Sequence, residues 1–133
     1  MKKLLLLLFM SVAFISSCKE KESDRFNFLT GTIWTPVSLL ADGVDASNTI
    51  LANFKGDAKF SEDGTGTFGI YTGKWYFNTS ETQIVISSED LDIPIIANIV
   101  ELTKTTLKLQ TSIPNPQNPT GPAINIELTF AAK

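Results

Sequence analysis

The sequence predicts an all-β domain, an eight-stranded antiparallel up-and-down barrel, in residues 28–133. Apolar and polar residues alternate there in short runs, and turns rich in Gly, Asn, Asp and Pro separate the runs. No window of about 12 residues keeps a helical period. Eight runs in about 105 residues leave about 13 residues for each strand with its turn, and turns of this length join antiparallel neighbours.

The first half of the domain contains four predicted strands, at residues 30–40, 51–60, 66–71 and 74–78. Pro36 marks a bend or an edge in the first of them, because proline donates no hydrogen bond to a sheet. Asp63-Gly64 predicts a hairpin turn, since both residue types tolerate a positive φ. A second glycine turn is expected near Gly73.

The second half contains the other four predicted strands, at residues 82–87, 93–102, 106–112 and 123–130. The strand at 93–102 must bend at Pro94. Residues 114–122 hold four of the six prolines and therefore form an extended loop. Only this segment and residues 41–49 are long enough for the crossing connections of a β-sandwich, which is the alternative fold.

One face of the middle strands carries large apolar side chains. At eight strands, the interior of a barrel is either filled by side chains or holds one small ligand. The side chains predicted to line such a cavity are those of Phe68, Ile70, Trp75, Phe77, Ile84 and Ile86. The same alternation is expected of a solid core, so both interpretations stand.

Residues 1–17 have the pattern of a cleaved signal peptide. Lys2 and Lys3 precede an unbroken apolar run at residues 4–10, and small residues follow further on. The apolar stretch is shorter than the about 20 residues that a membrane-spanning helix needs. We therefore exclude residues 1–17 from the folded domain.

The next residue, Cys18, is the only cysteine in the chain. Ile15-Ser16-Ser17-Cys18 resembles the lipobox of bacterial lipoproteins. The resemblance implies that Cys18 receives a diacylglyceryl group, that cleavage occurs just before it, and that the new N-terminus is acylated. Several acyl chains together anchor a protein stably to a membrane. The implied location is the outer membrane, at its periplasmic face or at the cell surface. The alternative is an ordinary signal peptide beside a stray cysteine.

Residues 18–27 alternate charges and have almost nothing to bury, which predicts a flexible tether between the lipidated cysteine and the domain. Nine extended residues reach about 30 Å. Removal of residues 1–17 takes away two lysines and no acids, so the mature chain has nine basic and fourteen acidic residues and a net charge of −5. This charge argues against nucleic acid as a partner.

The chain offers little for catalysis. It has no histidine, and its single cysteine is assigned to lipidation, so the usual nucleophile–base pairs and zinc sites are missing. We predict no enzyme activity, no cofactor and no metal. Glu89, Asp90 and Asp92 could supply oxygen ligands to calcium, but turn carboxylates facing water are the simpler interpretation.

Several motifs together resemble the lipocalin-like domains of small bacterial lipoproteins. These are the segment LTGTIW at residues 29–34, DGTGT at 63–67, GKW at 73–75, TKTTLKL at 103–109 and IELTF at 126–130. The resemblance implies a lipocalin-type barrel. Two features depart from the pattern. Ile33 is inserted before Trp34, which would turn the tryptophan to the other face unless a bulge absorbs the extra residue. No arginine near the last strand can cover that tryptophan.

Two functions remain open at this stage. The first is a lipid-anchored binding module of the cell envelope that holds a small apolar ligand in the barrel. The second is a solid scaffold that contacts or inhibits another envelope protein through its loops. Residues 114–122 are the candidate lid or partner-contacting segment, because prolines limit the entropy that a long loop loses on binding.

Overall fold

The computed structural model describes residues 23–133 of the chain, so the predicted signal peptide and Cys18 lie outside the described residues. The two helical elements are α2 (Asp24–Thr30) and the short 3-10 helix η1 (Ala52–Phe54). The strands are β1 (Ile33–Ala41), β2 (Val44–Asp45), β3 (Ala58–Phe60), β4 (Thr65–Phe68), β5 (Tyr71–Phe77), β6 (Gln83–Ser87), β7 (Ile95–Leu102), β8 (Thr106–Ile113) and β9 (Ile124–Ala132). In this part of the chain, no helix is long and apolar enough to span a bilayer.

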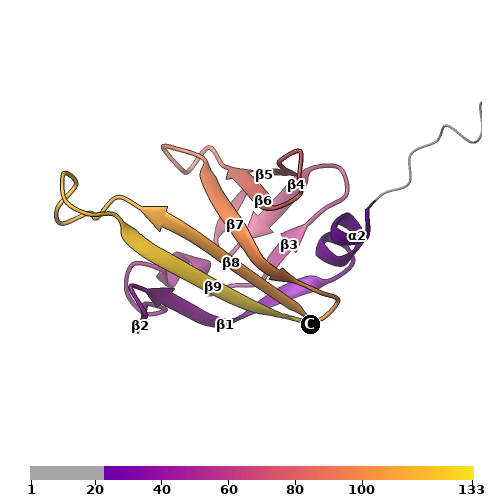
Figure 1. The fold of residues 1–133 in the computed structure, drawn as a ribbon, viewed down its shortest axis with the longest axis horizontal. Coiled ribbons are helices and arrows are strands. Elements are labelled where there is room, and N and C mark those ends of the chain that lie inside the picture. Colours follow the sequence, from indigo (N-terminus) through magenta and orange to yellow (C-terminus); the bar gives the residue numbers. More distant parts are fainter. Residues whose placement is uncertain (1–22) are drawn as a thin grey trace, which may run out of the picture.

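Eight of these strands form a closed antiparallel barrel (Figure 1). Each strand from β3 to β9 pairs with the next one, β1 pairs with β3, and β1 also pairs with β9 over seven residue pairs from Trp34–Ala132 to Ala41–Ile126. The two-residue strand β2 pairs with the last residues of β1 and stands outside this circuit. The predicted up-and-down barrel is therefore confirmed, and the β-sandwich is not the fold.

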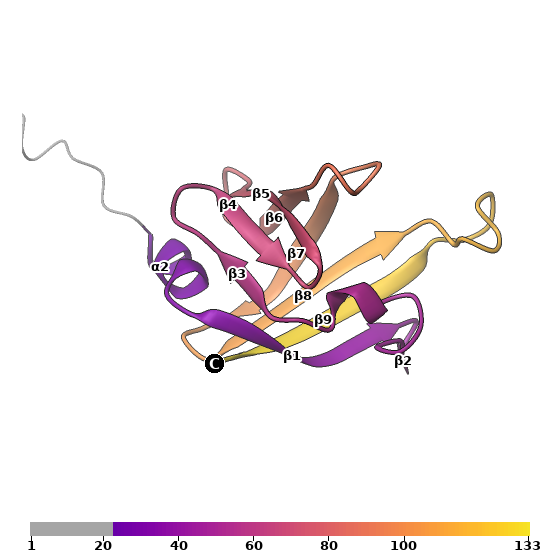
Figure 2. The ribbon, with the colours of Figure 1, turned by 180° about the vertical axis from the view of Figure 1, so that it is seen from behind.

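The two ends of the barrel differ. At one end, which we call the closed end, lie α2, the C-terminus and the turns β3–β4, β5–β6 and β7–β8 (Figure 1). At the other, the open end, lie the loop that carries β2 and η1, the β4–β5 turn, the β6–β7 loop and the long β8–β9 loop at residues 114–123 (Figure 2). The lid candidate thus lies at the opposite end from the helix.

Helix α2 corrects the prediction of a tether over residues 18–27. The side chain of Ser23 caps the helix by accepting a hydrogen bond from the Phe26 N–H at 3.1 Å, and Asp24 in the first turn suits the helix dipole. Leu29 is fully buried, and Ser23 Oγ also donates to Glu81 Oε2 at 2.5 Å. Residues 24–27 are therefore part of the folded domain, because the helix is held by tertiary contacts that a short charged sequence does not reveal.

Several observed strands differ in their bounds from the predicted ones. The first begins at Ile33 rather than at residue 30, because α2 continues to Thr30. Of the strand predicted at 51–60, only Ala58–Phe60 is extended, and Ala52–Phe54 is helical instead. The glycine turn expected near Gly73 lies at residues 69–70, and Gly73 is inside β5.

A β-bulge in β1 lets both halves of this strand face the interior. Trp34 and Leu39 are buried although they differ in parity, and the register against β9 shifts between Pro36 and Ser38. The extra residue, Val37, is 67% exposed. A bulge of one residue reverses the facing of all residues beyond it. Trp34 is fully buried, so the insertion of Ile33 does not turn it outward, and Ile33 itself lies on the surface side.

The closed end is filled by large side chains. The indole N–H of Trp34 donates to the Leu29 carbonyl at 3.0 Å, which joins the barrel to α2. Phe60 packs against Trp75 with ring centroids 5.6 Å apart, and Phe26 of α2 lies 5.8 Å from Trp75. Edge-on and tilted aromatic contacts of this kind add to the burial of apolar area. We call this group the aromatic plug; its members are Phe26, Trp34, Phe60, Trp75 and Phe77.

We predict that Leu29→Ala destabilises the domain by about 2–5 kcal/mol, because it leaves a cavity between α2 and the plug. The matched control is Val37→Ala, which shortens an exposed side chain and should cost less than about 1 kcal/mol. Urea denaturation followed by tryptophan fluorescence measures both. Equal effects of the two substitutions would show that α2 is not packed as described.

Candidate functional site

A cavity of about 480 Å³ occupies the open half of the barrel. Strand side chains form most of its wall: Ala58, Phe60, Phe68, Ile86, Ile95, Ala97, Leu109, Ile126, Leu128 and Phe130. Loop side chains surround its mouth: Ile50, Leu51, Phe54, Leu91, Asp92, Ile93, Pro94, Pro114 and Pro116. A cavity of this volume with a largely apolar lining is typical of a small-molecule site.

The barrel is hollow in one half because the large residues gather in the other half. Both tryptophans, Ile84 and Leu107 are buried but do not line the cavity. The cavity wall contains two alanines, Ala58 and Ala97, at buried positions of β3 and β7. Small side chains at inward positions leave the space that larger ones occupy near α2.

The structure separates the six residues predicted to line a cavity. Phe68 and Ile86 line it. Trp75 and Ile84 are buried in the solid half, and Phe77 is partly buried and packs against the same cluster. These three side chains do not reach the cavity. The sequence could not predict this, because the alternation tells which side chains point inward but not at which height along the barrel axis each one lies.

For Ile70 the prediction is wrong. This side chain is 69% exposed at the tip of the β4–β5 hairpin. Gly69 adopts a positive φ of 62° there, which reverses the chain and ends the alternation that Phe68 began. A Cβ on Gly69 would also lie 2.0 Å from the Asn53 carbonyl oxygen, so the turn and the loop with η1 approach each other closely only because residue 69 is glycine.

The loop around η1 supplies lining residues that sequence analysis missed. The N–H of Leu51 donates to the Ala46 carbonyl at 3.1 Å, and the Ile70 N–H donates to the Asn53 carbonyl at 3.0 Å. These bonds fold the loop inward, so that Leu51 and Phe54 reach the cavity. No periodic pattern marks such residues. The inward residues of β8 and β9, in contrast, were visible in the alternation of 106–112 and 123–130.

The cavity wall is chemically inert. Among residues 23–133 no polar or charged side chain is buried. Asp92 is the one ionisable residue in the lining, and it is exposed at the mouth. The hydroxyl of Thr111 donates to the Ile96 carbonyl at 2.8 Å. The interior therefore offers apolar surface for binding rather than groups that transfer protons.

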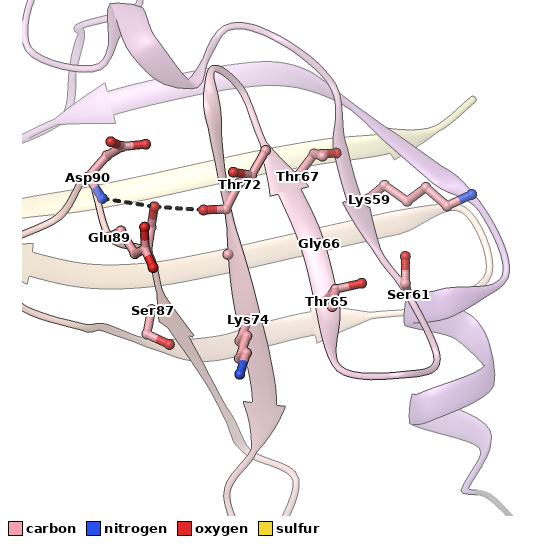
Figure 3. A pocket seen from close by; sticks show the side chains of 12 residues that line it. Lys59, Ser61, Thr65, Gly66, Thr67, Thr72, Lys74, Ser87, Glu89 and Asp90 are labelled. Atoms are coloured by element: carbon pink, nitrogen blue, oxygen red, sulfur yellow. Dashed lines mark hydrogen bonds between the residues drawn. The ribbon is translucent and has the colours of Figure 1, made fainter.

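A larger hollow of about 780 Å³ lies outside the barrel over β3–β6 (Figure 3). Serine and threonine hydroxyls, Lys59, Lys74, Glu89 and Asp90 line it, and the charged side chains stand at separate edges in Figure 3. A Cβ on Gly73 would lie 2.0 Å from the Ser87 carbonyl oxygen, so β5 and β6 approach closely on this surface only because residue 73 is glycine. We favour the smaller interior cavity as the site, because it encloses apolar surface, whereas this hollow is polar and open to water.

Several surface carboxylates among the described residues accept hydrogen bonds. Within residues 23–133, no three of His, Cys, Asp and Glu lie close enough to bind a metal, so Glu89, Asp90 and Asp92 do not form a calcium site there. The Lys133 ammonium donates to Asp57 Oδ2 at 2.8 Å and lowers the pKa of this carboxyl, and Thr65 lowers the pKa of Asp63 in the same way. Asp63 is exposed in the β3–β4 turn and Asp57 is half-buried just before β3, and neither lines the cavity.

No family model matches the chain, and no curated protein sequence matches it. Among solved structures, the chain is similar to bovine odorant-binding protein in complex with a selenium-containing odorant, with a TM-score of 0.52 and 16% sequence identity. The similarity covers 86% of this chain and 76% of the bovine chain. The chain has the lipocalin fold. The resemblance drawn from the sequence is therefore confirmed for the barrel. A sequence identity of 16% supports a conclusion about the fold and about nothing further.

Proposed function

We propose that this protein is a lipid-anchored binding module of the bacterial cell envelope that holds a small apolar ligand in its barrel. The observation that carries the proposal is the apolar cavity of about 480 Å³ at the open end. The similar bovine protein has an odorant bound, which supports the same use of the fold here. The alternative of a solid scaffold is weakened, because it requires a filled barrel.

The position of α2 supports an anchor at the closed end. Ser23 is bonded to Glu81 in the β5–β6 turn, and Cys18 precedes Ser23 by five residues, a reach of about 18 Å. A lipid on Cys18 would therefore hold the closed end toward the membrane, with the mouth turned away from it. In this orientation the barrel takes its ligand from the aqueous phase of the envelope rather than directly from the bilayer beneath it.

The loop at residues 114–123 suits the role of a lid at this mouth. Pro114 and Pro116 line the cavity, and the loop projects beyond the ends of β8 and β9 at the open end (Figure 1). Its prolines restrict the unbound conformations, so ordering the loop over a ligand costs less entropy.

Ligand binding is tested by narrowing the cavity. The full chain with Cys18→Ser is purified from a bacterial periplasm and examined by native mass spectrometry and by titration with the neutral apolar fluorophore N-phenyl-1-naphthylamine. Ala97→Leu and Ala97→Phe should weaken binding in that order, with about tenfold or more lost for Phe, because both side chains grow into the cavity.

The matched control is Val37→Phe, which enlarges an exposed side chain of β1 and should bind as the parent does. Thermal unfolding verifies that the Ala97 variants fold. Unchanged binding in folded Ala97→Phe, or no binding by the parent protein, would refute the proposed ligand site.

Lipidation of Cys18 is tested by cell fractionation. The unsubstituted protein should sediment with membranes and resist a carbonate wash, and Cys18→Ser should appear in the soluble fraction, because several acyl chains supply most of the membrane affinity. Mass spectrometry of the N-terminal peptide measures the added acyl mass. Persistence of Cys18→Ser in washed membranes would contradict the anchor.

A further inference from the structure

The charges around the barrel restrict which apolar ligands it can take. Among residues 23–133, the cavity wall contains no ionisable side chain, and Asp92 at the mouth is the one ionisable residue of the lining. A ligand with a carboxylate would have no cation to pair with inside. An unpaired buried charge is strongly disfavoured, so a charged head group must remain at the mouth.

The mouth itself is acidic. The loops of the open end carry Asp42, Asp45, Glu89, Asp90 and Asp92, against Lys55. Lys55 Nζ donates to Asn48 Oδ1 at 2.5 Å. The hydroxyl and N–H of Ser47 lower the pKa of Asp45. The positive charge of Lys55 also lowers the pKa of Asp45, so this cation is balanced by an acid of the same loop.

The long β8–β9 loop adds no compensating cation. Residues 114–123 consist of proline, polar and small residues without a charge. The loops of the open end carry mostly acidic charge, and a low-dielectric cavity beside such charges focuses the potential on whatever enters. An anionic head group at this mouth meets repulsion, whereas a neutral one meets none and a cationic one is attracted.

We propose that the barrel rejects apolar ligands with a carboxylate head and takes those with a neutral or a cationic head group. This inference rests on the proposed function, because it concerns the selectivity of the same cavity. It follows from two separate features, the apolar wall within the barrel and the acidic loops at its mouth.

Three probes with the same ten-carbon chain test the selectivity: 1-decanol, decanoate and decyltrimethylammonium. Each competes with N-phenyl-1-naphthylamine for the full chain carrying Cys18→Ser, at pH 7 and low ionic strength, where surface charges are least screened. We expect decanoate to bind at least about tenfold more weakly than decanol, and decyltrimethylammonium to bind as well as decanol or better.

Asp92→Asn removes the charge nearest the cavity. It should strengthen decanoate binding several-fold and weaken decyltrimethylammonium binding, so that the ratio of the two affinities shifts toward decanoate. Glu62→Gln removes the same charge from the β3–β4 turn at the closed end and should leave all three affinities unchanged.

The outcomes separate this inference from the proposed function. Decanoate binding as tightly as decanol, or tighter, would overturn the charge selectivity while the cavity remained a ligand site. Failure of the fluorophore and of all three probes to bind would overturn both. Equal effects of Asp92→Asn and Glu62→Gln would show that overall charge, and not the mouth, decides the selectivity, which also overturns it.

Discussion

The hydrogen bond from the Trp34 indole to the Leu29 carbonyl joins two parts of the chain that no sheet pairing connects. It lies in the fully buried contact between α2 and the start of β1, where both side chains have no exposed surface. A buried indole N–H without an acceptor would be costly, so Trp34 requires a chain segment at this position. The aromatic plug is built on that contact, and the plug decides which end of the barrel is closed.

The opposite end follows from the plug. Because both tryptophans gather beside α2, the remaining inward positions hold alanines, aliphatic residues and the rings of Phe68 and Phe130, which do not fill the barrel. The bulge at Val37 keeps β1 facing inward along its whole length, from Trp34 in the plug to Leu39 near the mouth. The loop with η1 covers part of the opening and forms a second small apolar cluster with Leu39 and Ile126. The barrel is therefore filled at the closed end and hollow at the open end without a buried polar side chain among the described residues. Its charged side chains lie on the surface and in the loops.

The strands were predictable because their signal is local. Alternation with period two, and turns marked by Gly, Asn and Asp, sufficed to find all eight strands of the barrel and their order. Helix α2 was not predictable in this way: seven residues are too few for a helical period, and the helix depends on Trp34 and on the contact of Ser23 with Glu81. The prediction that Ile70 lines the cavity was wrong for a related reason. The alternation does not distinguish a glycine within a strand from Gly69, which adopts a positive φ in a turn. Cavity depth was inaccessible as well, because Phe68 and Trp75 both point inward yet only Phe68 reaches the hollow half.

The central claim, a barrel filled at one end and hollow at the other, is tested most directly by xenon, which enters dry apolar cavities. Carbon-13 methyl spectra of the full chain with Cys18→Ser are recorded with and without xenon pressure. The account predicts shifts for methyl groups of Ile86, Ile95, Leu109 and Leu128, which line the cavity, and none for Leu29, Ile84 and Leu107 beside the plug. No shifts at all, or shifts of Ile84 and Leu107 as large as those of Leu109, would contradict it.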